Sequence, residues 1–148
     1  MASLLTLTFS QPTRDLAAGD LLVREGDPGG DLYVLESGAL SVERQGTVIA
    51  RLTQPGTLVG EMSVLTQSPN SATVRADGKA VVRVVKDAIQ FINRQPEIAV
   101  HIAGVLAQRL NATSKVLADL RTESGASPEE KSRMGRVLAA LLGPSWAG

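Results

Sequence analysis

Residues 32–52 read LYVLESGALSVERQGTVIARL, in which three short apolar or alternating runs are separated by the turn-forming pairs Ser37-Gly38 and Gln45-Gly46. Alternation over four to six residues, bounded by glycine, is typical of strands joined by tight turns. The pattern continues in both directions, and it predicts further strands at 4–9, 20–24, 72–76 and 80–85. Because these strands follow one another without intervening helices, the sequence predicts a mainly β fold, an antiparallel β-roll or jelly roll.

After Lys86 the pattern becomes helical. Pro96 suits the first turn of a helix, where its missing amide hydrogen would have had no partner, and the polar–apolar pattern then continues to about Thr122. Apolar residues spaced by three and four predict a coiled-coil seam and hence a homodimer through this long helix. The alternative is that the stripe covers only its own domain. The stripe consists of Ile102, Leu106, Leu110, Thr113, Leu117 and Leu120, and its spacing is that of a coiled-coil seam from Leu106 onward.

A last helix is predicted from Ser127-Pro128-Glu129-Glu130, where Ser127 caps the amide of Glu130 and proline occupies the first helical position. Its apolar face is expected to hold Met134, Val137, Leu138 and Leu141, and Gly143-Pro144 is expected to end it. The sequence thus predicts a β-roll with a long helix over 1–122, followed by a short linker and an amphipathic helix over 123–148.

The composition excludes several classes of protein. Lysine plus arginine number 15, as do aspartate plus glutamate, so the zero net charge predicts no general attraction to nucleic acid or to an anionic membrane. The absence of cysteine removes disulfides and thiolate chemistry and suits a cytoplasmic protein, and no stretch approaches the roughly 20 apolar residues of a membrane span. His101 is the only histidine, so neither a histidine metal site nor a serine–histidine–acid triad can form, and the protein is not expected to be an enzyme.

The ligand-binding residues are expected in the sequence LVGEMSVL at 58–65 and in PNSATV at 69–74. Gly60 allows a sharp turn, after which Glu61 begins a short helical turn whose first amides have no partner in the helix. Such a helix start binds phosphate. A carboxylate at Glu61 fits beside a phosphate only if it accepts a hydrogen bond from a sugar hydroxyl of the same ligand, so the pattern indicates a sugar phosphate.

These segments, together with AGD at 18–20 and REGDPGGDLYVLESG at 24–38, resemble the cyclic-nucleotide-binding domains of the catabolite activator family and of nucleotide-gated channels. The resemblance covers residues 14 to 122. It implies a regulatory module that senses cyclic AMP or cyclic GMP, needs no cofactor, and couples ligand binding to movement of its C-terminal helices.

The resemblance also implies individual roles. Glu61, after Gly60, matches the acceptor of the ribose 2′-hydroxyl, and the amides of Met62 and Ser63 match phosphate donors. Further along the chain, the Ser71 hydroxyl and the Ala72 amide match groups that reach the phosphate, and the pair Thr113-Ser114 matches residues that contact adenine.

One position departs from the family. Where the family has an arginine that neutralises the cyclic phosphate, this chain has Asn70. A charge-assisted hydrogen bond contributes about 1.5–3 kcal/mol, so its loss weakens binding by about one to two powers of ten. Two hypotheses follow: a sensor that binds its nucleotide weakly, or a degenerate domain that has lost the ligand and serves as a dimeric interaction module.

Direct DNA binding is not expected. Transcription factors of the catabolite activator family continue into a helix-turn-helix domain, whereas about 26 residues follow the long helix here. The chain is therefore expected to be a stand-alone sensor, or the regulatory piece of a larger protein, that acts on a downstream protein partner.

Overall fold

The structure is a computed structural model that describes residues 3–122, 125 and 127–142. The chain divides into two compact units, residues 1–100 and 101–148. The long helix α4 (Pro96–Thr122) begins in the first unit and ends in the second.

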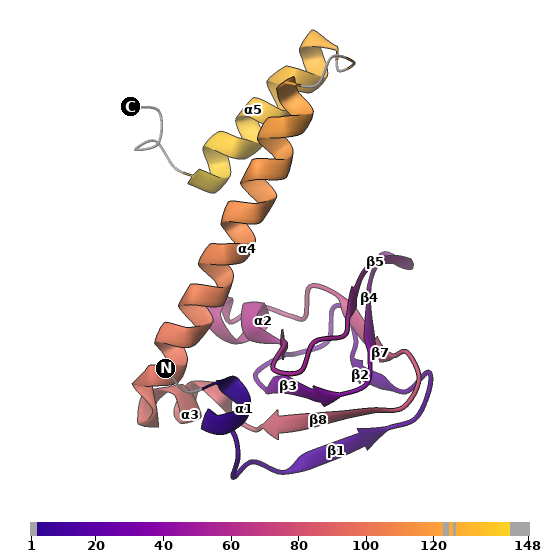
Figure 1. The fold of residues 1–148 in the computed structure, drawn as a ribbon, viewed down its shortest axis with the longest axis vertical. Coiled ribbons are helices and arrows are strands. Elements are labelled where there is room, and N and C mark those ends of the chain that lie inside the picture. Colours follow the sequence, from indigo (N-terminus) through magenta and orange to yellow (C-terminus); the bar gives the residue numbers. More distant parts are fainter. Residues whose placement is uncertain (1–2, 123–124, 126, 143–148) are drawn as a thin grey trace. The chain divides into compact units, whose positions relative to one another are not determined.

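Two four-stranded antiparallel sheets form the first unit (Figure 1), which confirms the predicted β-roll followed by helices. One sheet has the order β1-β8-β3-β6, made of β1 (Thr13–Leu16), β8 (Ala80–Val85), β3 (Leu32–Ser37) and β6 (Leu58–Val59). The other has the order β2-β7-β4-β5, made of β2 (Leu21–Val23), β7 (Thr73–Ala76), β4 (Leu40–Arg44) and β5 (Thr47–Leu52).

The alternation seen in the sequence fills the space between the sheets. Leu35 of β3, Leu40 of β4 and Val82 of β8 have no exposed surface, and each such side chain contributes about 1.5–3 kcal/mol when it leaves water. Residues of the remaining strands complete the same core, among them Leu16, Leu22, Val59, Val74 and Ala76. The two sheets are thus held together by one apolar layer.

The prediction of a strand at 4–9 was wrong, because this segment forms the short helix α1 (Leu4–Leu7). Ser3 caps it by accepting a hydrogen bond from the Thr6 amide at 3.2 Å, and the Thr8 hydroxyl donates to the Leu4 carbonyl at 2.6 Å. The hydroxyl residues that resembled the polar face of a strand thus satisfy backbone groups of a helical turn.

Three further elements were not predicted. β1 exposes three of its four residues and β6 has only two, so neither carries a clear alternation. The helix α3 (Ala88–Arg94) starts after Asp87, whose φ of 47° is left-handed and whose side chain makes no capping bond. It connects β8 to α4, which has the predicted limits.

In the second unit, α5 (Pro128–Leu142) begins with the predicted capping box. The Glu130 amide donates to the Ser127 hydroxyl at 3.2 Å, and the Ser127 amide donates to the Glu130 carboxylate at 2.7 Å. α5 contacts the end of α4, since a Cβ added to Gly135 would lie 3.0 Å from the Arg121 guanidinium. The predicted stop at Gly143-Pro144 lies outside the described residues.

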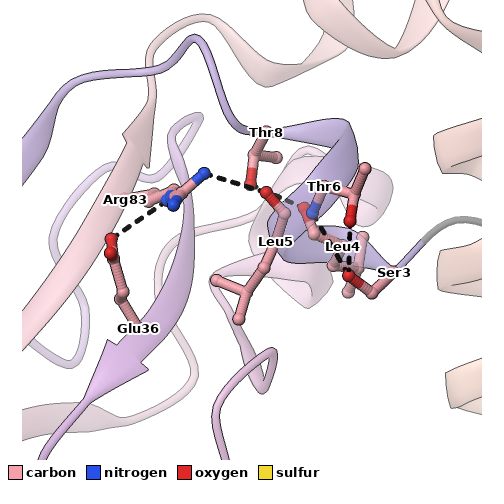
Figure 2. A network of polar contacts seen from close by, with 7 residues as sticks. All are labelled: Ser3, Leu4, Leu5, Thr6, Thr8, Glu36 and Arg83. Carbon is pink, nitrogen blue, oxygen red and sulfur yellow. Dashed lines mark hydrogen bonds and ion pairs between the residues drawn. The ribbon is translucent and has the colours of Figure 1, made fainter.

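A polar network attaches α1 to the first sheet (Figure 2). Arg83 of β8 pairs with the Glu36 carboxylate of β3 at 3.0 Å and donates to the Leu5 carbonyl of α1 at 2.8 Å. Its side chain is only 13 % exposed, and its guanidinium carbon lies 5.9 Å from the centre of the Phe9 ring. Arg83 therefore joins two strands and the N-terminal helix.

We expect Arg83→Met to lower the melting temperature by about 6 °C, because losing a charged hydrogen bond in a largely buried place costs about 2 kcal/mol. Glu36→Gln is the matched control: it removes the ion pair but leaves the bond from Arg83 to Leu5, so its effect should be smaller. Differential scanning calorimetry measures both. Equal melting temperatures for the parent and Arg83→Met would contradict this role of Arg83.

Candidate ligand site

The candidate site begins where β6 ends, at a turn that only glycine fits. Gly60 has φ 92°, in the left-handed region, and a Cβ placed on it would lie 2.6 Å from the Asp31 carbonyl oxygen. Any other residue would be strained by both its backbone angle and this contact. The chain can therefore pass directly from β6 into the helix α2 (Glu61–Thr66).

The start of α2 has the features that the sequence predicted. Its first helical hydrogen bond runs from the Val64 amide to the Gly60 carbonyl at 3.2 Å, so the amides of Met62 and Ser63 have no acceptor within the helix. No side chain caps this end. The turn is helical rather than extended, as a phosphate cradle requires.

Glu61 and Ser63 are both 5 % exposed, whereas the side chain of Met62 is 54 % exposed. The Ser63 hydroxyl donates to the Gly60 carbonyl at 3.0 Å. A carboxylate is costly to bury, and Glu61 opens the helix at the end where a negative charge is favoured. The acid is thus held inside the protein and not in the solvent.

Asn70 lies beside Ser63, with Gly29 between them. A Cβ added to Gly29 would be 2.3 Å from the Ser63 hydroxyl and 3.1 Å from the Asn70 side-chain oxygen. The Asn70 side-chain amide donates to the Arg24 carbonyl at 3.2 Å. It is therefore directed at the loop of residues 24–31, which joins β2 to β3 and is called loop 24–31 below.

Ser71 is exposed and Ala72 is half-buried, and together they lead from Asn70 into β7. Arg75, on β7, donates to the Gly19 carbonyl at 3.0 Å and lies 3.6 Å from the Glu43 carboxylate. Its guanidinium is therefore engaged with the Gly19 carbonyl and with Glu43 of β4.

Thr113 and Ser114 lie on α4 in the second unit. Thr113 is exposed, whereas Ser114 is 9 % exposed and donates its hydroxyl to the Asn111 carbonyl at 3.0 Å. The structure brings together Gly60, Glu61, Met62, Ser63 and Asn70; the ligand roles of all the candidate residues stay predictions.

An ion pair lies next to the turn at Gly60. The Lys86 ammonium is 2.8 Å from the Asp31 carboxylate, whose hydrogen bond and charge raise the pKa of Lys86. Burial, and then the charge of Asp31, raise the pKa of Tyr33. Because both pKa values are raised, Lys86 stays protonated and Tyr33 stays neutral near neutral pH.

Sequence reasoning missed how loop 24–31 is used. The glycines of the loop were included in the family resemblance, but nothing in the pattern indicated that the loop contacts both Ser63 and Asn70. A contact between residues some 40 positions apart leaves no periodic signal in a single sequence. The close approach of Gly29 to Ser63 and the hydrogen bond from Asn70 to the Arg24 carbonyl reveal these contacts.

Within the part of the chain that the structure describes, no group of three or more histidine, cysteine or acidic residues could hold a metal ion. His101, expected on a helix surface or at an interface, is half-buried, and its Nδ1 is buried without a hydrogen-bond partner among these residues. No helix in the same part of the chain is both long and apolar enough to cross a bilayer.

Comparison with known proteins agrees with the fold. The sequence profile of the family described as "Cyclic nucleotide-binding domain" matches residues 13–91, which is more than half of the chain. The protein therefore belongs to the cyclic nucleotide-binding domain family. A domain of this family is typical of non-catalytic regulatory modules.

The relatives include bacterial regulators. The chain is 31 % identical over 126 residues to the "CRP-like cAMP-activated global transcriptional regulator" of Mycobacterium tuberculosis, and 32 % identical over 131 residues to the "Cyclic AMP receptor protein" of Thermus thermophilus. These alignments cover 80 % and 84 % of the chain but only 56 % and 58 % of the relatives, so the chain spans little more than half their length.

Among solved structures, the catabolite activator protein of Thermus thermophilus is similar, with a TM-score of 0.64 and 26 % identity. The match covers 94 % of this chain and 85 % of that one. The similarity thus includes the β-roll and the helices that follow it.

We expect Gly60→Ala to destabilise the protein by at least about 1 kcal/mol, because alanine at a left-handed φ is strained and its methyl group would collide with the Asp31 carbonyl. Gly104→Ala in α4 is the matched control, since nothing lies within 4 Å of a Cβ there and a helical alanine gains about 0.5–1 kcal/mol. Urea unfolding measures both free energies. An unfolding free energy for Gly60→Ala equal to that of the parent would contradict the geometry of this turn.

Proposed function

We propose that the chain is a regulatory module that binds cyclic AMP or cyclic GMP through the turn after Gly60 and passes the binding event to its C-terminal helices. The observation that carries this proposal is the burial of Glu61 at the start of α2, directly after the left-handed glycine. An acid held there is placed to accept hydrogen bonds from a ribose, while the neighbouring amides meet the phosphate.

The chemistry of the turn supports a cyclic phosphate. Backbone amides at a helix start offer donors and a partial positive charge to an anion. The Ser71 hydroxyl and the Ala72 amide follow Asn70 closely enough in the chain to reach the same phosphate. Glu61 then discriminates for a ligand that carries a sugar hydroxyl as well as a phosphate.

Ligand binding and the position of the helices are coupled by thermodynamic linkage in this proposal. A ligand moves a conformational equilibrium only by its different affinities for the two arrangements. In this proposal the nucleotide draws residues 58–73, called the cassette below, inward. The helices then change position in response. Thr113 and Ser114 would then contact the base, and a downstream protein in the cytoplasm would read the change.

Asn70 favours a second candidate function, in which the domain has lost its ligand and acts as a dimeric interaction module. No cation stands at this position, and the Asn70 amide is already engaged with the Arg24 carbonyl. A cyclic phosphate in the site would therefore lack its usual compensating charge. The two candidates differ in nucleotide affinity, which can be measured.

The surface of α4 supports dimerisation in either case. Leu110 is 36 % exposed, Leu120 is 45 % exposed, and Val116 beside the seam is 57 % exposed. Apolar side chains spaced along a helix in this way pack well against a second copy of the same helix. We therefore propose a homodimer through α4.

To separate the two candidates, we expect titration calorimetry to give weak binding of cyclic AMP or cyclic GMP to the parent and about tenfold tighter binding to Asn70→Arg. The gain corresponds to one restored charge-assisted hydrogen bond, of about 1.4 kcal/mol or more. Adding Glu61→Gln to that variant should remove about the same amount, because the sugar loses a charged acceptor.

Thr13→Arg is the control for the added charge, since Thr13 lies on β1, at the opposite edge of the first sheet from β6. It should leave nucleotide affinity unchanged. If Asn70→Arg binds neither nucleotide at millimolar concentration, the sensor proposal fails and the interaction module remains.

The dimer is tested separately by light scattering. We expect Leu117→Asp to convert the dimer to monomers, because an uncompensated carboxylate would be buried in the seam. Lys115→Asp, which places the same group on an exposed position outside the seam, should leave the dimer intact. A parent that is monomeric at high micromolar concentration would refute the dimer.

A further inference from the structure

Asn70 makes more contacts with loop 24–31 than its role as a substitute for an arginine explains. Its backbone amide donates to the Asp27 carbonyl at 2.9 Å, and its carbonyl accepts from the Gly26 amide at 2.9 Å. Its side-chain amide donates to the Arg24 carbonyl at 3.2 Å. Position 70 is therefore joined to the first half of the loop by two main-chain hydrogen bonds and by a third that depends on the asparagine side chain.

The middle of the loop lies against the start of α2. Gly29 is so close to Ser63 that a Cβ on it would lie 2.3 Å from the Ser63 hydroxyl and 2.5 Å from its Cβ. The Asp31 carbonyl approaches Gly60 in the same way, because a Cβ added to Gly60 would lie 2.6 Å from the Asp31 carbonyl oxygen. Both ends of the first turn of α2 thus rest on loop 24–31.

The last residues of the loop hold the start of α3. The Ala88 amide donates to the Gly30 carbonyl at 3.0 Å, and the Asp87 amide donates to the Asp31 carboxylate at 3.2 Å. The same carboxylate pairs with Lys86. Since Asp87 makes no side-chain cap of its own, the loop supplies what would otherwise hold this helix start.

We propose that Asn70 is a positioning residue that fastens loop 24–31 as a clamp between the cassette and α3, and that through this clamp α3 responds to changes in the cassette. In this chain the residue at position 70 organises the loop rather than neutralising a phosphate. The part that concerns the nucleotide rests on the function proposed above. The clamp itself exists without any ligand.

The clamp has a simple energetic basis. Each neutral hydrogen bond contributes modestly, but the glycine contacts at 29 and 60 leave little space for the loop to shift independently. Loss of the Asn70 side-chain bond is therefore expected to loosen the loop as a unit, although the two main-chain bonds of position 70 remain. The free energy by which the cassette influences α3 must equal the free energy by which α3 influences the cassette, because coupling between two sites is reciprocal.

Amide hydrogen exchange, followed by NMR on the ligand-free full chain, tests the clamp. We expect Asn70→Ala to speed exchange at the amides of Asp87 and Ala88 about tenfold. The amides of Leu35 and Val84, which are hydrogen-bonded to Thr57 and Pro12, report global unfolding and should change less. Unchanged exchange at Asp87 and Ala88, or an equal rise at all four amides, would overturn the proposal.

Ser71→Ala is the matched control. It removes a hydroxyl that is proposed to reach the phosphate, and this hydroxyl makes no hydrogen bond to the loop among the described residues. In the ligand-free protein it should therefore leave exchange at Ala88 unchanged. Asp31→Ala tests the opposite end: it should loosen the Asp87 amide and, by reciprocity, raise exchange at Gly26 and Asn70 by a similar factor. No change at Gly26 and Asn70 would also overturn the proposal.

A further exchange measurement, made with cyclic AMP, depends on the proposed function. If the parent or Asn70→Arg binds it, saturation should slow exchange at Ala88 in the protein that binds, and adding Asp31→Ala to that protein should abolish the slowing. If neither protein binds it, the proposed function fails while the ligand-free comparison still decides on the clamp. If cyclic AMP binds but the exchange rate at Ala88 does not change, the proposed coupling is wrong and the proposed function still stands.

Discussion

The contact between Gly60 and the Asp31 carbonyl is the constraint on which the site depends. A backbone oxygen occupies the space where a side chain would begin, and the left-handed φ of 92° turns β6 directly into α2. Because this turn is fixed, Glu61 enters the interior and the amides of Met62 and Ser63 stay unbonded within the helix. The sheet and the helix start thus depend on one close approach of two backbone segments.

Asn70 has a second structural role, which its contacts with loop 24–31 show. Compared with the arginine expected from the family resemblance, the residue lacks a positive charge. Within this structure it is the residue that loop 24–31 contacts through three hydrogen bonds, next to Ser63. One side chain can therefore lack the charge of the family arginine and at the same time make a contact within the fold.

Much of the fold was predictable from the sequence. Alternating runs separated by glycine predicted the strands of the core, Pro96 marked the start of α4, and the capping box at Ser127 marked the start of α5. The segment at 4–9 was mistaken for a strand because its hydroxyl residues bond locally, which periodicity does not detect. For the candidate site, the turn at Gly60 was recognisable, whereas the contacts of loop 24–31 join distant residues and required coordinates.

The close approaches at Gly29 and Gly60 bear on how such proteins change over generations. Both positions exclude a methyl group for reasons of backbone packing, whether or not a nucleotide is ever present. A lineage that ceased to respond to a second messenger would still keep these glycines, since replacing them would damage the scaffold. Among family members, the polar residues around the turn are therefore the better record of whether signalling has been retained.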